Sequence, residues 1–242
     1  MTTNMSGMPA EASSAPWLRI GVTGGMACGK SLVGAYLQAL GVAVIEADVV
    51  CHDLMRVGAP LFSRIVSVFG SAILAPDGGI DRAVLGRRVF GDAAALGRLN
   101  AILHPAAQDA IEAWVRVRRE EARRQSAAAI GNQQTAIGNS AREWRGGVAA
   151  IIPLLYEASW EAAWDRVICV GAPMALQRRR LRSKGFTEEE VYARLAAQWP
   201  VEEKMKRADY VIFNAGTPWC AQMQTVQVMQ QIGKHVENSD GR

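Results

Sequence analysis

The sequence predicts an α/β protein in which a parallel β-sheet is flanked by helices on both faces. Five short apolar runs predict the strands, over residues 18–23, 42–45, 148–152, 167–170 and 210–213. The runs do not alternate apolar with polar residues, which is typical of strands buried on both faces. Helical patterns lie between them, and a chain that alternates between strands and helices favours parallel pairing.

The first run leads directly into a glycine-rich segment. It has the spacing G-x-x-x-x-G-K-S, at Gly24-Gly25-Met26-Ala27-Cys28-Gly29-Lys30-Ser31, and a helical pattern follows. Glycines there let backbone amides surround phosphate oxygens, and the helix start adds a positive dipole end. Lys30 would serve the β- and γ-phosphates and Ser31 an Mg²⁺ ion. The alternative is a glycine-rich turn with an incidental lysine, but the strand–loop–helix setting favours a P-loop and a P-loop NTPase-type sheet.

The second run ends in Glu46-Ala47-Asp48. In parallel α/β sheets, ligands bind beyond the carboxyl ends of the strands. A carboxylate there can accept the proton of an attacking hydroxyl or help to hold Mg²⁺. Asp48 could equally cap a helix that begins near Val49, and the local sequence does not decide between these interpretations.

Residues 49–124 predict several successive helices and almost no strand, which indicates a helical subdomain inserted between two strands. Asp81 is a good N-cap for a helix that ends near Phe90. His104 precedes Pro105, and a residue in that position most often marks a helix boundary. In a protein that transfers phosphate, such a subdomain is where the acceptor would dock.

Two later segments bracket the third strand. Residues 126–147 are rich in Gly, Asn and Gln and predict a surface loop or disordered insertion without a role in chemistry. Glu157 closes the segment Pro153-Leu154-Leu155-Tyr156-Glu157 after that strand. It could join a phosphate or acceptor network, or be one exposed acid on an apolar turn.

Residues 173–207 predict a helix–turn–helix that carries Arg180 and Arg194, and Thr187 with Glu190 has the spacing of a capping box. Cations on a mobile hairpin over a P-loop can stabilise charge on a transferring phosphoryl group. Without the P-loop, an ordinary charged surface hairpin would be the better interpretation.

Composition narrows the class of partner. The net charge of +4 over 242 residues suits a small anionic substrate and is far from a nucleic-acid-binding stripe. The four cysteines form no C-x-x-C pair, and His52 and His235 show no metal-ligand spacing. No apolar stretch reaches the length of a membrane span. We expect a cytoplasmic protein without nucleic-acid or membrane partners. It should have a single domain over 18–236, with disordered tails over 1–17 and 237–242. The sequence does not indicate the oligomeric state.

Seven segments, taken in order, resemble the dephospho-CoA kinase family. They are residues 23–31, Glu46-Ala47-Asp48, and residues 99–105, 153–157, 177–180, 194–198 and 208–216. The resemblance covers the chain from about Leu18 to the last helix. It implies transfer of the ATP γ-phosphate to the ribose 3′-hydroxyl of dephospho-CoA, the last step of coenzyme A synthesis. It also implies a P-loop core, a helical CoA-binding subdomain and a helical lid.

The same resemblance implies roles for single residues. Asp48 would be the general base, Lys30 and Arg180 would act on the transferring phosphate, and Ser31 would hold Mg²⁺. The acceptor would contact Asp48, His104, Glu157 and Arg194. The nucleotide would contact Gly24, Gly25, Ala27, Cys28, Gly29, Lys30, Ser31, Leu32, Arg180, Asn214 and Gly216.

Five positions depart from the family pattern: Glu46 for an aspartate, Cys28 for a small residue, Leu32 for a threonine, Lys184 for an arginine and Gly171 for an acid. None removes an indispensable group, but Lys184 gives up bidentate phosphate geometry. Another P-loop kinase, with a nucleoside or sugar acid as acceptor, is the rival among enzymes. A GTPase-like switch would need an N-K-x-D signature, which is absent, and intact Lys30, Ser31 and Asp48 speak against a module without catalysis.

Overall fold

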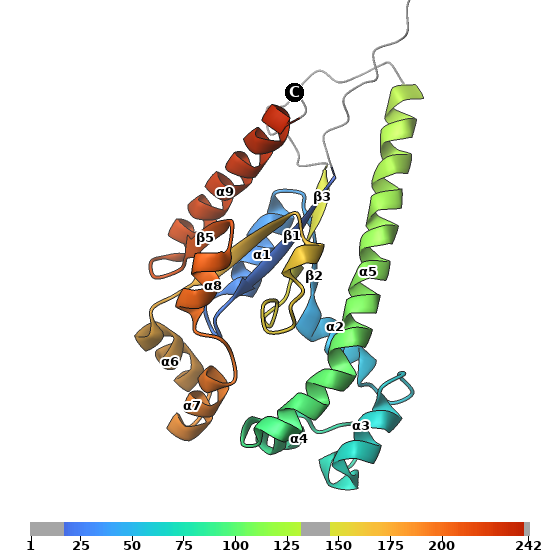
Figure 1. Ribbon diagram of the computed structural model, residues 1–242, viewed down its shortest axis with the longest axis vertical. Helices are drawn as coiled ribbons and strands as arrows, with labels where there is room; N and C mark the ends of the chain where they lie inside the picture. Colours follow the sequence, from blue (N-terminus) through green and yellow to red (C-terminus); the bar gives the residue numbers. More distant parts are fainter. Residues whose placement is uncertain (1–16, 132–145, 240–242) are drawn as a thin grey trace, which may run out of the picture.

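The computed structural model describes residues 17–131 and 146–239, and it confirms the predicted α/β architecture (Figure 1). The strands are β1 (Leu18–Gly24), β2 (Ala43–Glu46), β3 (Gly147–Ile151), β4 (Arg166–Gly171) and β5 (Tyr210–Phe213). They form one sheet in the order β2-β3-β1-β4-β5, and every pair is parallel. Each predicted strand is therefore correct to within a residue at either end. All five carboxyl ends lie at one edge of the sheet, where loops can build a site.

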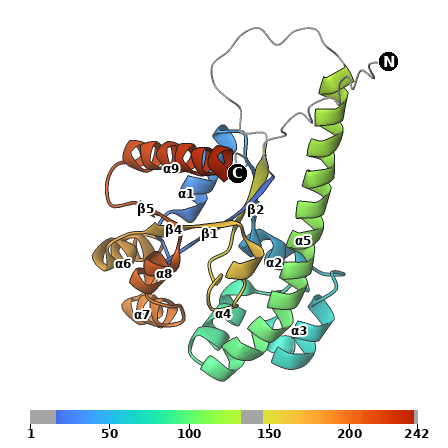
Figure 2. The same ribbon diagram turned by 45° about the horizontal axis from the view of Figure 1, so that its top comes forward.

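Helices cover both faces of this sheet (Figure 2). One face carries α1 (Lys30–Ala39) and α9 (Pro218–Ser239), and the other carries the long helix α5 (Ala93–Gly131). Leu37 of α1 and Ile232 of α9 share a buried core with Val22 of β1. Ile111 of α5 shares a second core with Val148 of β3. The strands are thus buried from both sides, which explains why their sequences do not alternate.

The segment after β2 is helical, as its sequence predicts. It contains α2 (Ala47–Leu54), α3 (Phe62–Phe69), the short 3₁₀ helix η1 (Ser71–Ile73) and α4 (Arg82–Phe90). These helices and the start of α5 enclose a core of their own, which includes Ile65, Leu85 and Leu99. Asp81 is the predicted N-cap of α4, because its carboxylate accepts hydrogen bonds from the amides of Ala83 and Val84.

Helix α5 corrects two predictions. It does not end at His104, because the helix continues through Pro105, and Figure 1 shows α5 bending between its lower part and its upper part. Proline removes one backbone hydrogen bond and disfavours the interior of a helix. Ile102 before it and Ile111 after it are buried, so packing on both sides of Pro105 outweighs this preference. The predicted loop over 126–147 is also wrong for residues 126–131, whose alanine-rich sequence extends the helix.

The described residues also limit the predicted tails and insertion. Residues 1–16, 132–145 and 240–242 lie outside them, so the expectations for these segments stay predictions. Trp17 packs against the core of β3, and α9 continues to Ser239, so neither tail reaches as far as expected. Within the described ranges, neither α5 nor any other helix combines the length and apolarity needed to cross a membrane.

A helical hairpin lies beyond the carboxyl ends of the strands, opposite the α3–α4 helices (Figure 1). It consists of α6 (Met174–Arg182) and α7 (Glu188–Ala196), and α8 (Val201–Arg207) returns the chain to β5. The predicted capping box is present, since Thr187 and Glu190 exchange side-chain-to-amide hydrogen bonds. Glu188 forms ion pairs with Arg178 and Arg182 on α6, and these exposed pairs link the two helices at the surface.

Candidate active site

The glycine-rich loop between β1 and α1 has a backbone that only small residues permit. Gly24 has φ of +144°, and a Cβ atom there would lie 2.1 Å from the carbonyl oxygen of Val170. Gly29 has φ of +98°, and a Cβ atom there would lie 2.2 Å from Nδ2 of Asn214. Ala27 also has a positive φ, of 56°. The loop therefore curls tightly before α1 begins at Lys30, as a phosphate-binding loop requires.

Lys30 folds back over this loop. Its Nζ donates hydrogen bonds to the carbonyl oxygens of Gly24, at 3.1 Å, and Gly25, at 2.9 Å. Burial lowers the pKa of the Lys30 ammonium, and the neighbouring Cys28 and Asp48 oppose this shift. A partly desolvated ammonium at the start of a helix is a strong electrostatic partner for a phosphate.

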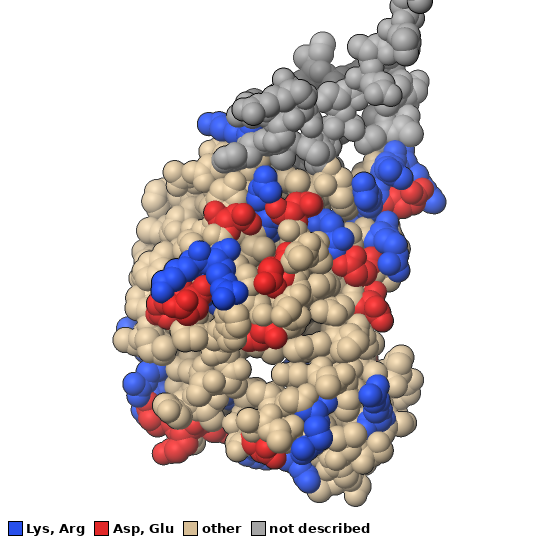
Figure 3. Space-filling model, in the orientation of Figure 1, with Lys and Arg blue, Asp and Glu red and all other residues tan. Residues whose placement is uncertain are grey.

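Two cavities open side by side at the carboxyl edge of the sheet. One, of about 530 Å³, lies over the glycine-rich loop, and the other, of about 610 Å³, lies between α4, α5 and the α6–α7 hairpin. The space-filling view shows a small opening in the lower half of the molecule (Figure 3). The two cavities have four wall residues in common: Met26, Asp48, Pro153 and Gln198. A group bound in one cavity therefore meets a group bound in the other beside these four residues.

Most residues expected to bind a nucleotide line the cavity over the loop. Those in its wall are Ala27, Gly29, Lys30, Ser31, Leu32, Arg180 and Asn214. Gly24, Gly25, Cys28 and Gly216 line neither cavity. Cys28 is fully buried beneath the loop, where its carbonyl oxygen accepts a hydrogen bond of 2.9 Å from Nδ2 of Asn214. The hydrogen bond between Asn214 and Cys28 therefore helps to fix the backbone of the loop.

Arg180 connects the hairpin to the loop. It projects from α6, and its guanidinium donates to the carbonyl oxygens of Ala27, at 3.0 Å, and Asn214, at 3.2 Å. Lys184, in the turn after α6, lines the same cavity. The hairpin therefore places two cations beside the loop, in addition to Lys30.

The larger cavity is mainly apolar, with few charged groups. Its apolar walls come from the helices after β2 and include Met55, Leu85, Val89 and Leu103. His104 is half-buried in the wall, and burial lowers the pKa of its imidazole while the charge of Glu157 opposes this shift. The ring is therefore mostly neutral at pH 7.

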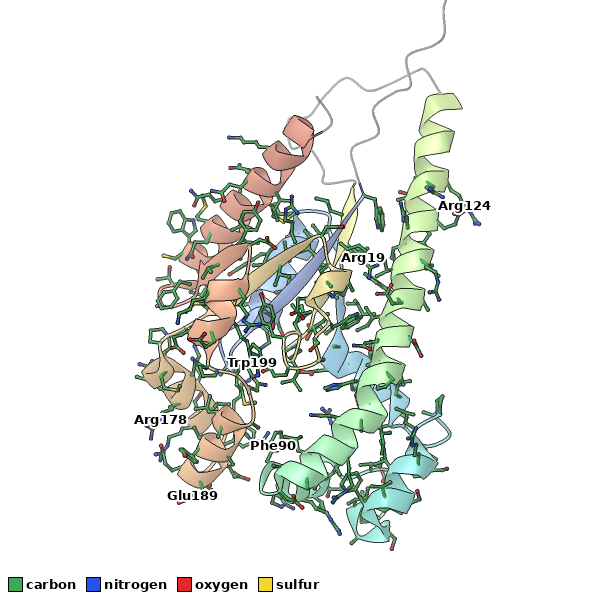
Figure 4. All side chains as sticks on the ribbon, in the orientation of Figure 1. Arg19, Phe90, Arg124, Arg178, Glu189 and Trp199 are labelled. Atoms are coloured by element: carbon green, nitrogen blue, oxygen red, sulfur yellow. The ribbon has the colours of Figure 1, made fainter. Side chains whose placement is uncertain are left out.

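Arg194 of α7 reaches into this cavity from the hairpin. Its guanidinium carbon lies 4.4 Å from the centre of the Phe90 ring and 4.1 Å from that of Phe186. Phe90 ends α4, on the opposite side of the cavity, and Figure 4 shows it beside the hairpin. The cation thus joins the hairpin to the α3–α4 helices across the cavity.

Glu157 is not in the wall of either cavity. Its Oε1 atom lies 2.7 Å from Nζ of Lys204 and accepts a hydrogen bond of 2.9 Å from the amide of Trp199. Its Oε2 atom is buried without a hydrogen-bond partner among the described residues. The structure therefore places Glu157 behind the cavity wall, between the loop after β3 and the end of α7.

Oxygen ligands suitable for a hard cation lie at the edge of the loop cavity. The hydroxyl of Ser31 donates to Oε2 of Glu46 at 3.2 Å, and Asp48 lies in the same cavity wall. Glu46 is the N-cap residue of α2 and Asp48 lies in the first turn, so Asp48 is not the helix cap. The described part of the chain has no group of three or more His, Cys, Asp or Glu side chains placed to hold a metal. The few oxygen ligands of Ser31, Glu46 and Asp48 nevertheless fit Mg²⁺, because this ion keeps several waters and takes further ligands from substrate phosphates.

Three residues without a predicted role also lie at this site. Gln198 lines both cavities, and Gln177 is buried with its Nε2 donating to Ala172. Lys204 is completely buried. The sequence does contain an indication that Lys204 is buried. It lies three residues after Val201 and four before Ala208, which is the spacing of residues on one buried helix face.

The structure also explains the departure at Gly171. A Cβ atom at this position would lie 2.4 Å from Sδ of Met205 and 3.3 Å from the ring of Phe213. An acidic side chain therefore has no room at the end of β4 unless Met205 moves.

Comparison with known proteins identifies relatives of this chain. The profile of the family described as dephospho-CoA kinase matches residues 18–218. A dephospho-CoA kinase from Anaeromyxobacter dehalogenans is 43% identical over 202 residues, which are 82% of this chain and 84% of that protein. Among solved structures, TT1252 from Thermus thermophilus has a TM-score of 0.64 and 28% identity, covering 89% of this chain and 97% of that one. A dephospho-CoA kinase from Campylobacter jejuni has a TM-score of 0.59 and 26% identity, covering 90% and 98%.

Proposed function

Because the chain belongs to the dephospho-CoA kinase family, we propose that it transfers the γ-phosphate of ATP to the 3′-hydroxyl of the dephospho-CoA ribose, which is the last step of coenzyme A synthesis. The observation that carries this proposal is the placement of Asp48 in the wall shared by two adjoining cavities. One cavity has the loop, lysine and helix start that suit a triphosphate. The other has the size and apolar walls that suit the remaining parts of a large organic acceptor.

Asp48 acts as the general base. The ribose hydroxyl lies between the two cavities and loses its proton to the Asp48 carboxylate as its oxygen attacks the γ-phosphorus. The bond from the γ-phosphorus to the β,γ-bridging oxygen breaks, and ADP leaves with that oxygen.

Cations around the glycine-rich loop stabilise the charge on the transferring group. Lys30 exchanges its hydrogen bonds to Gly24 and Gly25 for phosphate oxygens, and Arg180 already lies against the loop through Ala27. Ser31, with Glu46 and Asp48 beside it, would hold Mg²⁺. When bound, this ion neutralises charge on the phosphates.

The acceptor occupies the larger cavity, where His104 and Arg194 contact it. The neutral imidazole of His104 can donate one hydrogen bond and accept another, and Arg194 supplies positive charge for the acceptor's diphosphate. Glu157 lies behind the wall of this cavity and supports it through Lys204 and Trp199, without contacting the acceptor. The four free cysteines suit the cytoplasmic setting that we propose for this reaction.

A coupled assay for ADP release tests the acceptor. The purified protein is incubated with ATP and Mg²⁺ and with dephospho-CoA, adenosine, pantothenate or gluconate in parallel. We expect ADP to form at a high rate only with dephospho-CoA, and mass spectrometry should show one added phosphate at the 3′ position. Faster turnover of any of the other three acceptors would overturn the proposal.

A further inference from the structure

Lys204 is the one charged side chain among the described residues that is completely buried. It projects from α8, and its Nζ lies 2.7 Å from Oε1 of Glu157 and 2.7 Å from the carbonyl oxygen of Pro153. A buried ammonium is strongly unfavourable unless such partners surround it. The contacts are therefore a specific arrangement rather than a surface ion pair.

Each partner of Lys204 is also held by a third group. Oε1 of Glu157 accepts the amide of Trp199, and the carbonyl oxygen of Pro153 accepts a hydrogen bond of 3.3 Å from the hydroxyl of Thr23. Thr23 is the next-to-last residue of β1, just before the loop, and Trp199 follows the hairpin helix α7. One ammonium group thus joins the loop after β3 to the end of β1 and to the base of the hairpin.

These contacts lie directly behind the shared wall of the two cavities. Pro153 is itself one of the four shared wall residues, and Trp199 follows Gln198, which is another. Trp199 also stacks on Tyr156, with ring centres 6.3 Å apart. The guanidinium carbon of Arg207, on α8, lies 4.7 Å from the centre of the Trp199 ring. Side chains of α8 therefore fix the backbone at Pro153 and next to Gln198, which are two of the four shared wall residues.

Stability alone does not explain a lysine here. Replacing a buried ion pair with apolar side chains of similar volume is often neutral or stabilising, so a methionine could fill this space. An apolar side chain, however, could not bond Pro153 and Glu157 at the same time. The charge of Lys204 also reaches the glycine-rich loop: burial is the main cause of the lowered pKa of Lys30, and Lys204 adds to it.

We propose that Lys204 is a positioning residue for phosphoryl transfer, which fixes the wall between the nucleotide and acceptor cavities through Pro153 and Glu157. This inference rests on the proposed function, because it supposes that groups in the two cavities react with each other. Lys204 does not touch either substrate. It sets where Pro153 and Gln198 lie, and thereby the alignment of the hydroxyl with the phosphate.

The test compares Lys204→Met with Lys206→Met, a matched control on the same helix. Lys206 also lies 2.7 Å from a carboxylate, that of Glu203, but both of these side chains are exposed. We expect Lys204→Met to lower kcat by about 100-fold, the effect of misaligning reactants by about 1 Å, and to change the KM for ATP less than about 3-fold. Lys206→Met should keep the wild-type kcat. A kcat for folded Lys204→Met within about 3-fold of wild type would overturn the proposal.

A double variant separates positioning from stability. Lys204→Met leaves Glu157 buried without its cation, whereas Lys204→Met with Glu157→Gln removes both charges and keeps an acceptor for the Trp199 amide. We expect the double variant to recover most of the lost melting temperature but not kcat. Recovery of kcat together with stability would show a merely structural role, and the double variant also serves if the single variant does not fold. If the wild type is inactive with dephospho-CoA, only the proposed acceptor is wrong. The same variants are then compared on the alcohol that the wild type does phosphorylate, and the proposal for Lys204 is tested there.

Discussion

The side chain of Asn214 donates a hydrogen bond of 2.9 Å to the carbonyl oxygen of Cys28, a residue 186 positions earlier in the chain. Both residues are buried, and the bond joins the end of β5 to the glycine-rich loop. Gly29 leaves the space that this amide occupies. The shape of the loop therefore depends on a residue from the opposite end of the sequence, as well as on its own glycines.

Asn214→Ala should weaken ATP binding. The substitution leaves the Cys28 carbonyl buried without its partner, which costs about 1–3 kcal/mol, and the loop backbone can relax away from the phosphates. We expect the Kd for ATP, measured by isothermal titration calorimetry, to rise about 10-fold. Unchanged affinity would show that the loop keeps its shape without Asn214.

Gln224→Ala provides the control for Asn214. Gln224 is also an amide that bonds β5, through the N–H and carbonyl of Phe213, but it lies on α9 away from the cavities. This variant should lose stability in urea denaturation and retain the wild-type affinity for ATP.

Asp48→Asn should reduce turnover while leaving nucleotide binding largely intact. The amide cannot accept the proton of the attacking hydroxyl, but it leaves the contacts of Lys30 and Arg180 with the loop in place. We expect kcat to fall by about 10²-fold or more, with little change in the Kd for ATP. Near-normal kcat would remove Asp48 as the base.

Asp53→Asn is the matched change on the same helix. Asp53 is exposed and forms an ion pair of 3.1 Å with Arg56. Surface pairs of this kind contribute little, so kcat and stability should both stay near their wild-type values.

Arg194→Leu should act on the acceptor side. It removes the cation between Phe90 and Phe186, a contact that is worth up to about 2 kcal/mol when desolvated. We expect the KM for dephospho-CoA to rise about 10-fold or more, while the KM for ATP stays within about 2-fold. Arg182→Leu, which removes an exposed arginine of the same hairpin, should leave both constants unchanged. An equal rise in both constants for Arg194→Leu would contradict a role specific to the acceptor.

Much of this fold could be predicted because its signals are local. The strands are short apolar runs, and the caps at Asp81 and Thr187 need only residues within three positions. In these places a short segment already contains the interactions that define its structure. The glycine-rich loop also shows in its own sequence the glycines that its backbone requires, but the hydrogen bond from Asn214 that completes its shape comes from a distant residue.

The remaining features depend on partners that are distant in sequence. Pro105 disfavours a helix locally, and only packing on both sides of it keeps α5 continuous. Glu157 stands where an acceptor-binding acid was expected, but its ion pair comes from Lys204 on α8. The crowding at Gly171 comes from Met205. A single sequence does not show which of its helices will face these positions.

His104→Gln should change the pH dependence of stability. Burial holds the pKa of His104 in the folded protein below its ordinary value of 6.5, so the unfolded chain binds this proton more readily. The free energy of unfolding contributed by His104 is therefore complete above pH 6.5 and is lost as the pH falls through the lowered pKa. Relative to His104→Gln, the wild type should become less stable between pH 7.5 and pH 5, by at most about 1.4 kcal/mol per pH unit.

Urea denaturation at a series of pH values measures this difference, since all other titrating groups are common to both proteins. If the curves of His104→Gln and the wild type were parallel, the imidazole of His104 would titrate alike in the folded and unfolded chain. His104 would then not be the neutral group that the acceptor cavity is proposed to present at pH 7.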